Sequence, residues 1–296
     1  MRGKPLNFLL KNGLLLGLAL IQLSIWDAPT ATTHAPATTP VTTPAPVTTY
    51  APYVSVLLLF VILRNLILCW GIEYFSRHRP YAIVNYTDPP EAFSGEFLLY
   101  MIQGSLLEIT TQVASLYAIG NTASSYLRDL LTFIPLSLCV EVIFDFFHYW
   151  AHRFAHTIPL LYKLHRTHHS HYHIKPILAF YQNIVDMTIS NMFPYALSIY
   201  ITNSAYWLIF GISITRFQLA LLYSYKIFIE IAGHSNRTSY PTCCFPQCIW
   251  LPQALGIELY SDDHNRHHSK VQGNYAKRFA LWDRVFNTFI GDSFVM

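Results

Sequence analysis

Long apolar stretches constrain this chain more than any other feature. The strongest covers residues 54–75 and is interrupted by Arg64 and, near its end, by Glu73. Weaker apolar stretches lie at 94–119, 130–147, 188–201 and 205–231. A helix of about 20 apolar residues is long enough to cross the hydrocarbon core of a bilayer. Hydrophobic residues make up 53% of the sequence and charged residues only 12%, outside the range of soluble domains. The sequence therefore predicts an all-α membrane protein with about four to five transmembrane helices.

The N-terminal region has two segments of different composition. Residues 1–27 place Arg2, Lys4 and Lys11 ahead of an apolar run, the pattern of a secretory signal peptide or of a signal anchor that is retained. Residues 28–52 are rich in threonine and proline, so they cannot form a core and are interpreted as a lumenal linker, either O-glycosylated or unmodified. We therefore divide the chain into these two segments, an N-terminal transmembrane region at 53–128 and a histidine-rich domain at 129–290.

Charges beside the apolar stretches predict the orientation in the membrane. Arg77, His78 and Arg79 follow the strongest stretch directly, which marks a cytosolic end. Counting spans from there places the histidine-rich segments in the cytosol, with the last two stretches forming a hairpin that turns at 202–204. Glu108 and Arg216 lie at membrane depth and are expected to form interhelical or interfacial ion pairs.

Histidines are concentrated beyond what a structural role would need. Eight of the 14 lie between 148 and 173, and a similar group follows almost a hundred residues later. Residues three or four apart on a helix share a face, so each group could direct its nitrogens one way. The candidate ligands are His152, His156, His165, His168, His169, His234, His264, His267 and His268.

Nine imidazoles exceed the needs of one metal ion, because a structural zinc site takes four ligands and a catalytic zinc site takes three. Two ions with about four or five nitrogen ligands each, and room for a small molecule, fit this number better. Imidazole suits zinc, copper, iron and nickel alike, so the pattern does not select the metal. The alternative is a set of ordinary polar histidines at the membrane surface. Three groups with the correct spacing argue against this alternative.

Three further residues are candidates for contact with the ligands. His148 lies one turn before His152 and is either a ligand or a neighbour that packs beside one. Asp145 and Asp263 are candidates to accept a hydrogen bond from a ligand imidazole. His171 and His173 are expected to be solvated, and Cys243, Cys244 and Cys248 to be reduced structural cysteines, with zinc binding or palmitoylation as alternatives.

The histidine motifs and their flanks resemble the sterol desaturase and fatty acid hydroxylase superfamily. The resemblance rests on Tyr149-Trp150-Ala151-His152-Arg153-Phe154-Ala155-His156, on Leu164-His165-Arg166-Thr167-His168-His169 and on Asp263-His264-Asn265-Arg266-His267-His268. It covers roughly 130–290 and implies that the nine candidate histidines, His234 included, hold two iron ions. The resemblance also implies a membrane enzyme of the endoplasmic reticulum, with its active site facing the cytosol. Such an enzyme uses O2, with electrons from NAD(P)H that commonly arrive through cytochrome b5 or a reductase, to hydroxylate or desaturate a sterol or long-chain lipid.

One departure from the family pattern concerns the substrate. Many sterol-acting members carry a His-Pro-x-Glu element after the second histidine motif, whereas this chain has Phe180-Tyr181-Gln182-Asn183 and then Asp186. Hydroxylation is favoured slightly over desaturation. The alternative function is a non-catalytic metal-binding or lipid-sensing membrane protein on the same scaffold. A nucleic-acid partner is disfavoured because the formal net charge is only +3.

Overall fold

The computed structural model describes residues 4–31, 51–80, 95–120, 124–170, 175–238, 240–241 and 250–291. Throughout these ranges the regular elements are helical, and extended pairing is confined to isolated bridges such as that between Pro241 and Tyr260. The prediction of an all-α protein is confirmed. The long helices are α1 (Lys4–Ala31), α2 (Ala51–Ser76), α3 (Gly95–Ile119), α4 (Tyr126–Thr157), α7 (Phe193–Phe210) and α8 (Arg216–Gly233).

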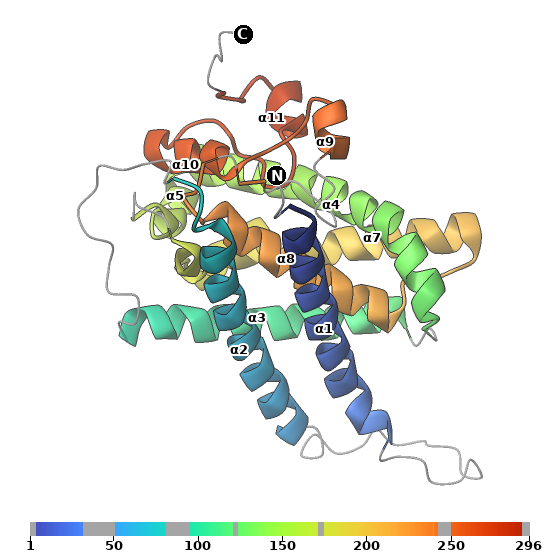
Figure 1. Cartoon of the computed structure of the whole chain (residues 1–296). Helices are drawn as coiled ribbons and strands as arrows, with labels where there is room; N and C mark the ends of the chain where they lie inside the picture. The colour runs from blue at the N-terminus through green and yellow to red at the C-terminus, as the bar shows by residue number, and fades with distance from the viewer. Residues whose placement is uncertain are drawn as a thin grey trace.

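Short helical elements connect and cover the long ones. Two follow α4 directly, and most of the others lie near the same end of the bundle (Figure 1). They are α5 (Pro159–His165), η2 (His168–Ser170), η3 (Pro176–Phe180), α6 (Ile184–Met187), the π-helical η4 (Thr188–Met192), α9 (Trp250–Ala254), α10 (Ser261–Lys270) and α11 (Leu281–Val285). Pro159 is the first residue of α5, so the predicted break between the first two histidine motifs is confirmed.

Helix α8 is the centre of the bundle. Every residue from Phe217 to Gly233 is buried, and α1, α2, α3 and α4 all contact α8 (Figure 1). A helix that is covered on all sides belongs to the interior of a fold. Because α8 is central, its C-terminal residue and the following His234 lie under the short helices that cover this end of the bundle.

Among the described residues, three helices are long and apolar enough to cross a membrane: Leu6–Ala28, Val54–Ser76 and Tyr126–Thr157. The latter two contain the predicted spans 54–75 and 130–147. The other three predicted spans are helical but more polar, since α3 carries Glu96 and Glu108 and α8 carries Arg216, Lys226 and Glu230. By composition the structure thus has fewer independent spans than the four to five predicted.

The turn of the predicted hairpin lies later than expected. The polar residues 202–204 are inside α7, which continues to Phe210 and ends at Gly211 in the left-handed conformation. The side chain of Ser204 donates to the carbonyl of Tyr200, and Asn203 Oδ1 accepts from the backbone N–H of Ile214. Because the side chains of Asn203 and Ser204 find partners in this way, they do not break the helix.

Both ionisable residues expected to form pairs at membrane depth do so, with partners that the sequence did not indicate. Glu108 accepts from Arg64 at 2.6 Å, and both side chains are buried. Arg216 pairs with Asp27 of α1 at 2.8 Å. Helix α1 is thus joined to the bundle by a polar contact as well as by apolar packing.

Candidate metal centre

All nine histidines predicted as ligands lie at one end of the bundle, although they come from elements far apart in sequence. Helix α4 has 32 residues, about 48 Å at 1.5 Å per residue, and its last turns carry His152 and His156. A bilayer needs only about 20 of these residues, so the histidine-bearing end extends beyond the hydrocarbon core. The remaining histidines come from α5 and η2, from the C-terminal cap of α8 and from α10.

The structure divides these nine residues into two groups. Within each group every histidine offers a nitrogen within 4.8 Å of the others. The first group, called here the five-histidine group, is His152, His156, His165, His169 and His267. The second, the four-histidine group, is His168, His234, His264 and His268.

Neighbouring histidines in the sequence belong to different groups. His168 and His169 separate in this way, and so do His267 and His268. Successive side chains on a helix diverge by about 100°, whereas residues four apart share a face. His165 therefore joins His169, and His264 joins His268. Each His-x-x-His-His motif in this way contributes to both groups.

The Nε2 atoms within each group face one another at short range. In the five-histidine group, His165 Nε2 lies 3.2 Å from His152 Nε2 and 3.0 Å from His169 Nε2. In the four-histidine group, His264 Nε2 lies 3.3 Å from His234 Nε2 and 3.1 Å from His268 Nε2. Two nitrogens bound to one metal at about 2.0–2.1 Å would be separated by about 3 Å, so these distances fit metal binding.

Backbone carbonyls determine which ring nitrogen faces inward. The Nδ1 atoms of His152, His267 and His234 contact the carbonyls of Tyr275 at 2.8 Å, Gly273 at 2.7 Å and Glu230 at 2.9 Å. A carbonyl can only accept, so each Nδ1 carries the hydrogen and each Nε2 of a neutral ring presents a lone pair. Converging lone pairs repel one another unless a cation lies between them. This arrangement fits a metal site.

Burial favours the neutral form of the imidazoles of η2 and α10. It lowers the pKa of His169 to about 2, with neighbouring histidines adding to the effect. Burial also lowers the pKa values of His168, His264, His267 and His268 well below their usual range. Neutral imidazole is the form that binds metals, so the site presents ligands at neutral pH.

Asp186, which sequence reasoning did not identify as part of the site, contacts one candidate ligand. Its Oδ2 accepts from His165 Nδ1 at 2.9 Å and from Gln182 Nε2 at 2.7 Å. A carboxylate in this position orients a metal ligand and raises its basicity. The available signal was an acidic residue at the start of an apolar stretch, shortly after the second histidine motif.

Asp145 and Asp263 were predicted to accept a hydrogen bond from a ligand imidazole, but among the described residues their hydrogen-bond partners are other groups. The carboxylate of Asp145 accepts three backbone N–H groups, from Lys277, Arg278 and Phe279. Asp263 accepts from the backbone N–H of Tyr260 and pairs with Arg266 at 2.8 Å, which stabilises the N-terminal end of α10. Both carboxylates therefore hold backbone segments near the site, because unpaired N–H groups at turns and helix ends are the closer donors.

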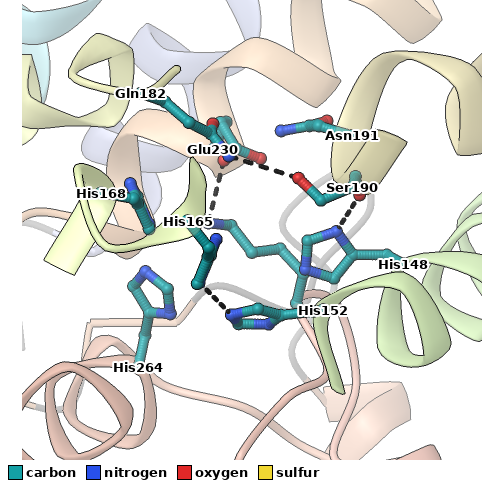
Figure 2. Close-up of a pocket in the computed structure, with 10 residues that line it drawn as sticks. His148, His152, His165, His168, Gln182, Ser190, Asn191, Glu230 and His264 are labelled. Carbon is teal, nitrogen blue, oxygen red and sulfur yellow. Dashed lines mark hydrogen bonds and ion pairs between the residues drawn. The ribbon is translucent and has the colours of Figure 1, made fainter. Parts of the chain in front are cut away.

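His148 lies outside both groups. Its Nδ1 contacts the carbonyl of Ser190 at 2.5 Å, and its ring centroid is 5.2 Å from that of His152. It lines a small cavity together with members of both groups (Figure 2). His171, His173 and the three clustered cysteines at 243, 244 and 248 lie outside the described residues.

The fold and site define an all-α membrane protein with a buried, two-part histidine centre. The family model for fatty acid hydroxylases matches residues 137–288, just over half of the chain. The chain therefore belongs to the fatty acid hydroxylase family. The matched segment includes all nine candidate ligands.

Each of the curated relatives described next matches about half of the chain. Fatty acid hydroxylase vlmA of Lecanicillium sp is 28% identical over 158 residues, which cover 50% of this chain and 40% of the relative. Human alkylglycerol monooxygenase is 27% identical over 150 residues, 49% of this chain and 28% of the relative. Methylsterol monooxygenase erg25B of Aspergillus fumigatus is 26% identical over 149 residues, which cover 50% of this chain and 45% of the relative. The chain thus spans less than half the length of these relatives, and no solved structure matches it.

Proposed function

We propose that this protein is a membrane-bound oxidoreductase that uses O2 to oxidise a C–H bond of a sterol or long-chain lipid, with hydroxylation favoured over desaturation. The observation that carries the proposal is the division of nine imidazoles, eight of them buried and one half-buried, into groups of five and four. The names of the relatives, which include hydroxylases and monooxygenases of lipids, support the reaction class. We further propose that the metal is iron, and that electrons come from NAD(P)H through cytochrome b5 or a reductase.

The chain's own residues prepare the site for such a reaction. Two iron ions held by the histidine groups would supply the reduction of O2 and the oxidation of the C–H bond. The imidazoles would bind them without adding negative charge, and the carbonyls at residues 230, 273 and 275 hold three rings in register. Asp186 orients His165 in the same way. Burial excludes bulk water from the site, which protects a reactive centre from side reactions.

A small, largely apolar pocket lies beside the site. Ala151 and Ala155 of α4 line it together with Leu161, Leu164 and Ile189, and it reaches Asp186 and Ser190 next to the histidines. Its volume of about 10 Å³ corresponds to a single water-sized molecule, so its support for a lipid substrate is its apolar lining and its position. Ile189 is 43% exposed, so the pocket lies close to the outer surface of the bundle. We propose an endoplasmic reticulum membrane with this end of the bundle facing the cytosol.

The test is lipid analysis of cells that express the wild-type chain or His168→Ala, supplied with 18O2. A labelled hydroxyl group in a lipid, present only with the wild type, establishes a hydroxylase. An unlabelled lipid two hydrogens lighter establishes a desaturase. Bound metal without any oxygen-dependent lipid product would contradict the proposal and favour a metal-binding or lipid-sensing role.

A further inference from the structure

A small cavity lies between the two histidine groups. His152 and His165 of the five-histidine group and His168 and His264 of the four-histidine group line it (Figure 2). Its volume of about 10 Å³ corresponds to a single water-sized molecule. A water remains in such a space only where two to four polar partners hold it. The other walls of the cavity determine whether those partners exist.

His148 offers an unused hydrogen-bond acceptor to this cavity. Its Nδ1 carries the hydrogen, because it bonds the carbonyl of Ser190, and its Nε2 therefore presents a lone pair when the ring is neutral. The residue is 5% exposed, and Nε2 is buried with no hydrogen-bond partner among the described residues. Buried polar atoms are nearly always paired, so an unpaired one that lines a cavity is a candidate to bind a water molecule. His148 lines the cavity and lies outside both histidine groups.

Lys277 supplies donors on another wall. Its Nζ pairs with Glu230 Oε1 at 2.9 Å, and both side chains are buried and line the cavity. An ammonium group has three N–H donors, and the Glu230 pair needs one of them. The cavity is thus lined by an acceptor on α4 and by a donor from the segment between α10 and α11.

We propose that His148 is a positioning residue that holds one water molecule between the two histidine groups, with Lys277 donating to the water and the water donating to His148 Nε2. The inference rests on the proposed function. Hydroxylation of one C–H bond by one O2 takes up two electrons and two protons, forms the C–O bond and releases one water. Under that function the electrons come from NAD(P)H and the protons come from the solvent. The fixed water passes protons on at a defined place: it gives up one proton and takes one from the Lys277 ammonium, which the solvent reprotonates, so the water is not consumed.

Two substitutions separate this role from that of the Ser190 contact. An asparagine amide nitrogen lies near the position of a histidine Nδ1, so His148→Asn keeps the bond to Ser190 and leaves the cavity side empty. A glutamine amide reaches the position of Nε2, so His148→Gln keeps a polar group at the cavity. The exposed His78 provides the control His78→Gln.

The experiment uses the metal-loaded full-length protein in lipid nanodiscs. We expect an experimental structure of the wild type to show a water within hydrogen-bond distance of His148 Nε2, and that of His148→Asn to lack it. Metal content stays at the wild-type level in both variants. In His148→Asn the kcat falls at least about ten-fold and the solvent deuterium isotope effect on kcat rises, with KM for the lipid unchanged. His148→Gln retains most of the activity.

Three results would overturn the inference. Loss of metal from His148→Asn would show that His148 is a metal ligand. An unchanged kcat and isotope effect in that variant would show that its role is structural. A wild-type structure without the water would show that His148 holds no water in this cavity. If the wild type forms no oxygen-dependent lipid product, the proposed function fails, while the water density and the metal content still test the position of the water.

Discussion

Two buried polar clusters lie within this apolar bundle, and they differ in whether their charges are matched within the chain. In the cluster around Arg64, the guanidinium donates to both oxygens of Glu108 at 2.6 Å, to Gln22 at 3.1 Å and to Asn65 at 2.9 Å. The positive charge of Arg64 is thus matched by the negative charge of Glu108. In the histidine centre, acceptors face acceptors, and both ring nitrogens of His156 are buried without a partner among the described residues.

The comparison shows that burial alone does not identify a functional cluster. Ionisable residues at membrane depth are functional candidates by default, yet Arg64 has the partners of a structural ion pair. In the histidine centre groups of one kind converge, and their ring nitrogens are the donor atoms that a cation would take. A cluster that needs a cation from outside is a binding site, and one that contains its own cation stabilises the fold. Substitutions in each cluster should therefore affect different properties.

The largest effect is expected from removing one ligand of either histidine group. His267→Ala and His268→Ala change adjacent residues that belong to different groups. We expect each variant to lose about half of the bound metal and more than about 100-fold of the activity, beyond the range usual for outer contacts of a metal site. Metal analysis and lipid product formation measure this, with His78→Ala as the control. Full metal content in either variant would contradict the two-group division.

Substitutions in the Arg64 cluster should change the free energy of unfolding and leave metal binding unchanged. Arg64→Met leaves the Glu108 carboxylate buried and unpaired, and breaking a buried ion pair costs about 3–5 kcal/mol. Thermal unfolding in detergent should show this loss, with the metal content per folded protein unchanged. The double variant Arg64→Met with Glu108→Met removes both charges and should recover much of the stability. Loss of metal from folded Arg64→Met would remove the distinction between the clusters.

Asp186→Asn should weaken the histidine centre without abolishing it. The amide can no longer act as a charged acceptor for His165 Nδ1, and such changes typically lower metal affinity or activity about 10–100-fold. A competitive chelator titration measures the affinity. Asp263→Asn is the matched control, because Asp263 bonds the end of α10 and no imidazole. Equal losses of affinity in the two variants would show that Asp186 acts only through the fold.

The smallest effect is expected where α1 joins the Arg64 cluster. Gln22→Leu removes one hydrogen bond to Arg64, and such bonds within membranes contribute about 0.6–1.7 kcal/mol. The variant should unfold at a slightly lower temperature with the same metal content.

We expect the intact mass of the wild type to include α1, since Gln22 and Asp27 both contact other helices. A mature protein that begins after residue 28 would contradict this and identify the segment as a cleaved signal peptide.

The sequence predicted the local components of the site, because local periodicity determines them. The spacing of His152 with His156, and of His165 with His169, sets which rings share a face, and Pro159 separates the first two motifs. Four of the five apolar stretches are helical for the same reason, whereas 205–231 contains the turn, which begins at Gly211 instead of lying at 202–204. That shift depended on partners for Asn203 and Ser204 that no local pattern contains.

The sequence by itself determined which residues could bind metal and that they belong to a helical membrane bundle. Only the tertiary structure decided how the nine histidines divide into five and four, which carboxylate contacts them, and that Asp145 and Asp263 hold backbone segments instead. These contacts join residues far apart in sequence, such as His152 with Tyr275 and His165 with Asp186. Helix geometry determines which side chains of one helix share a face. Which side chains of different helices meet depends on how the helices pack, and the spacing of residues along the chain does not specify that packing.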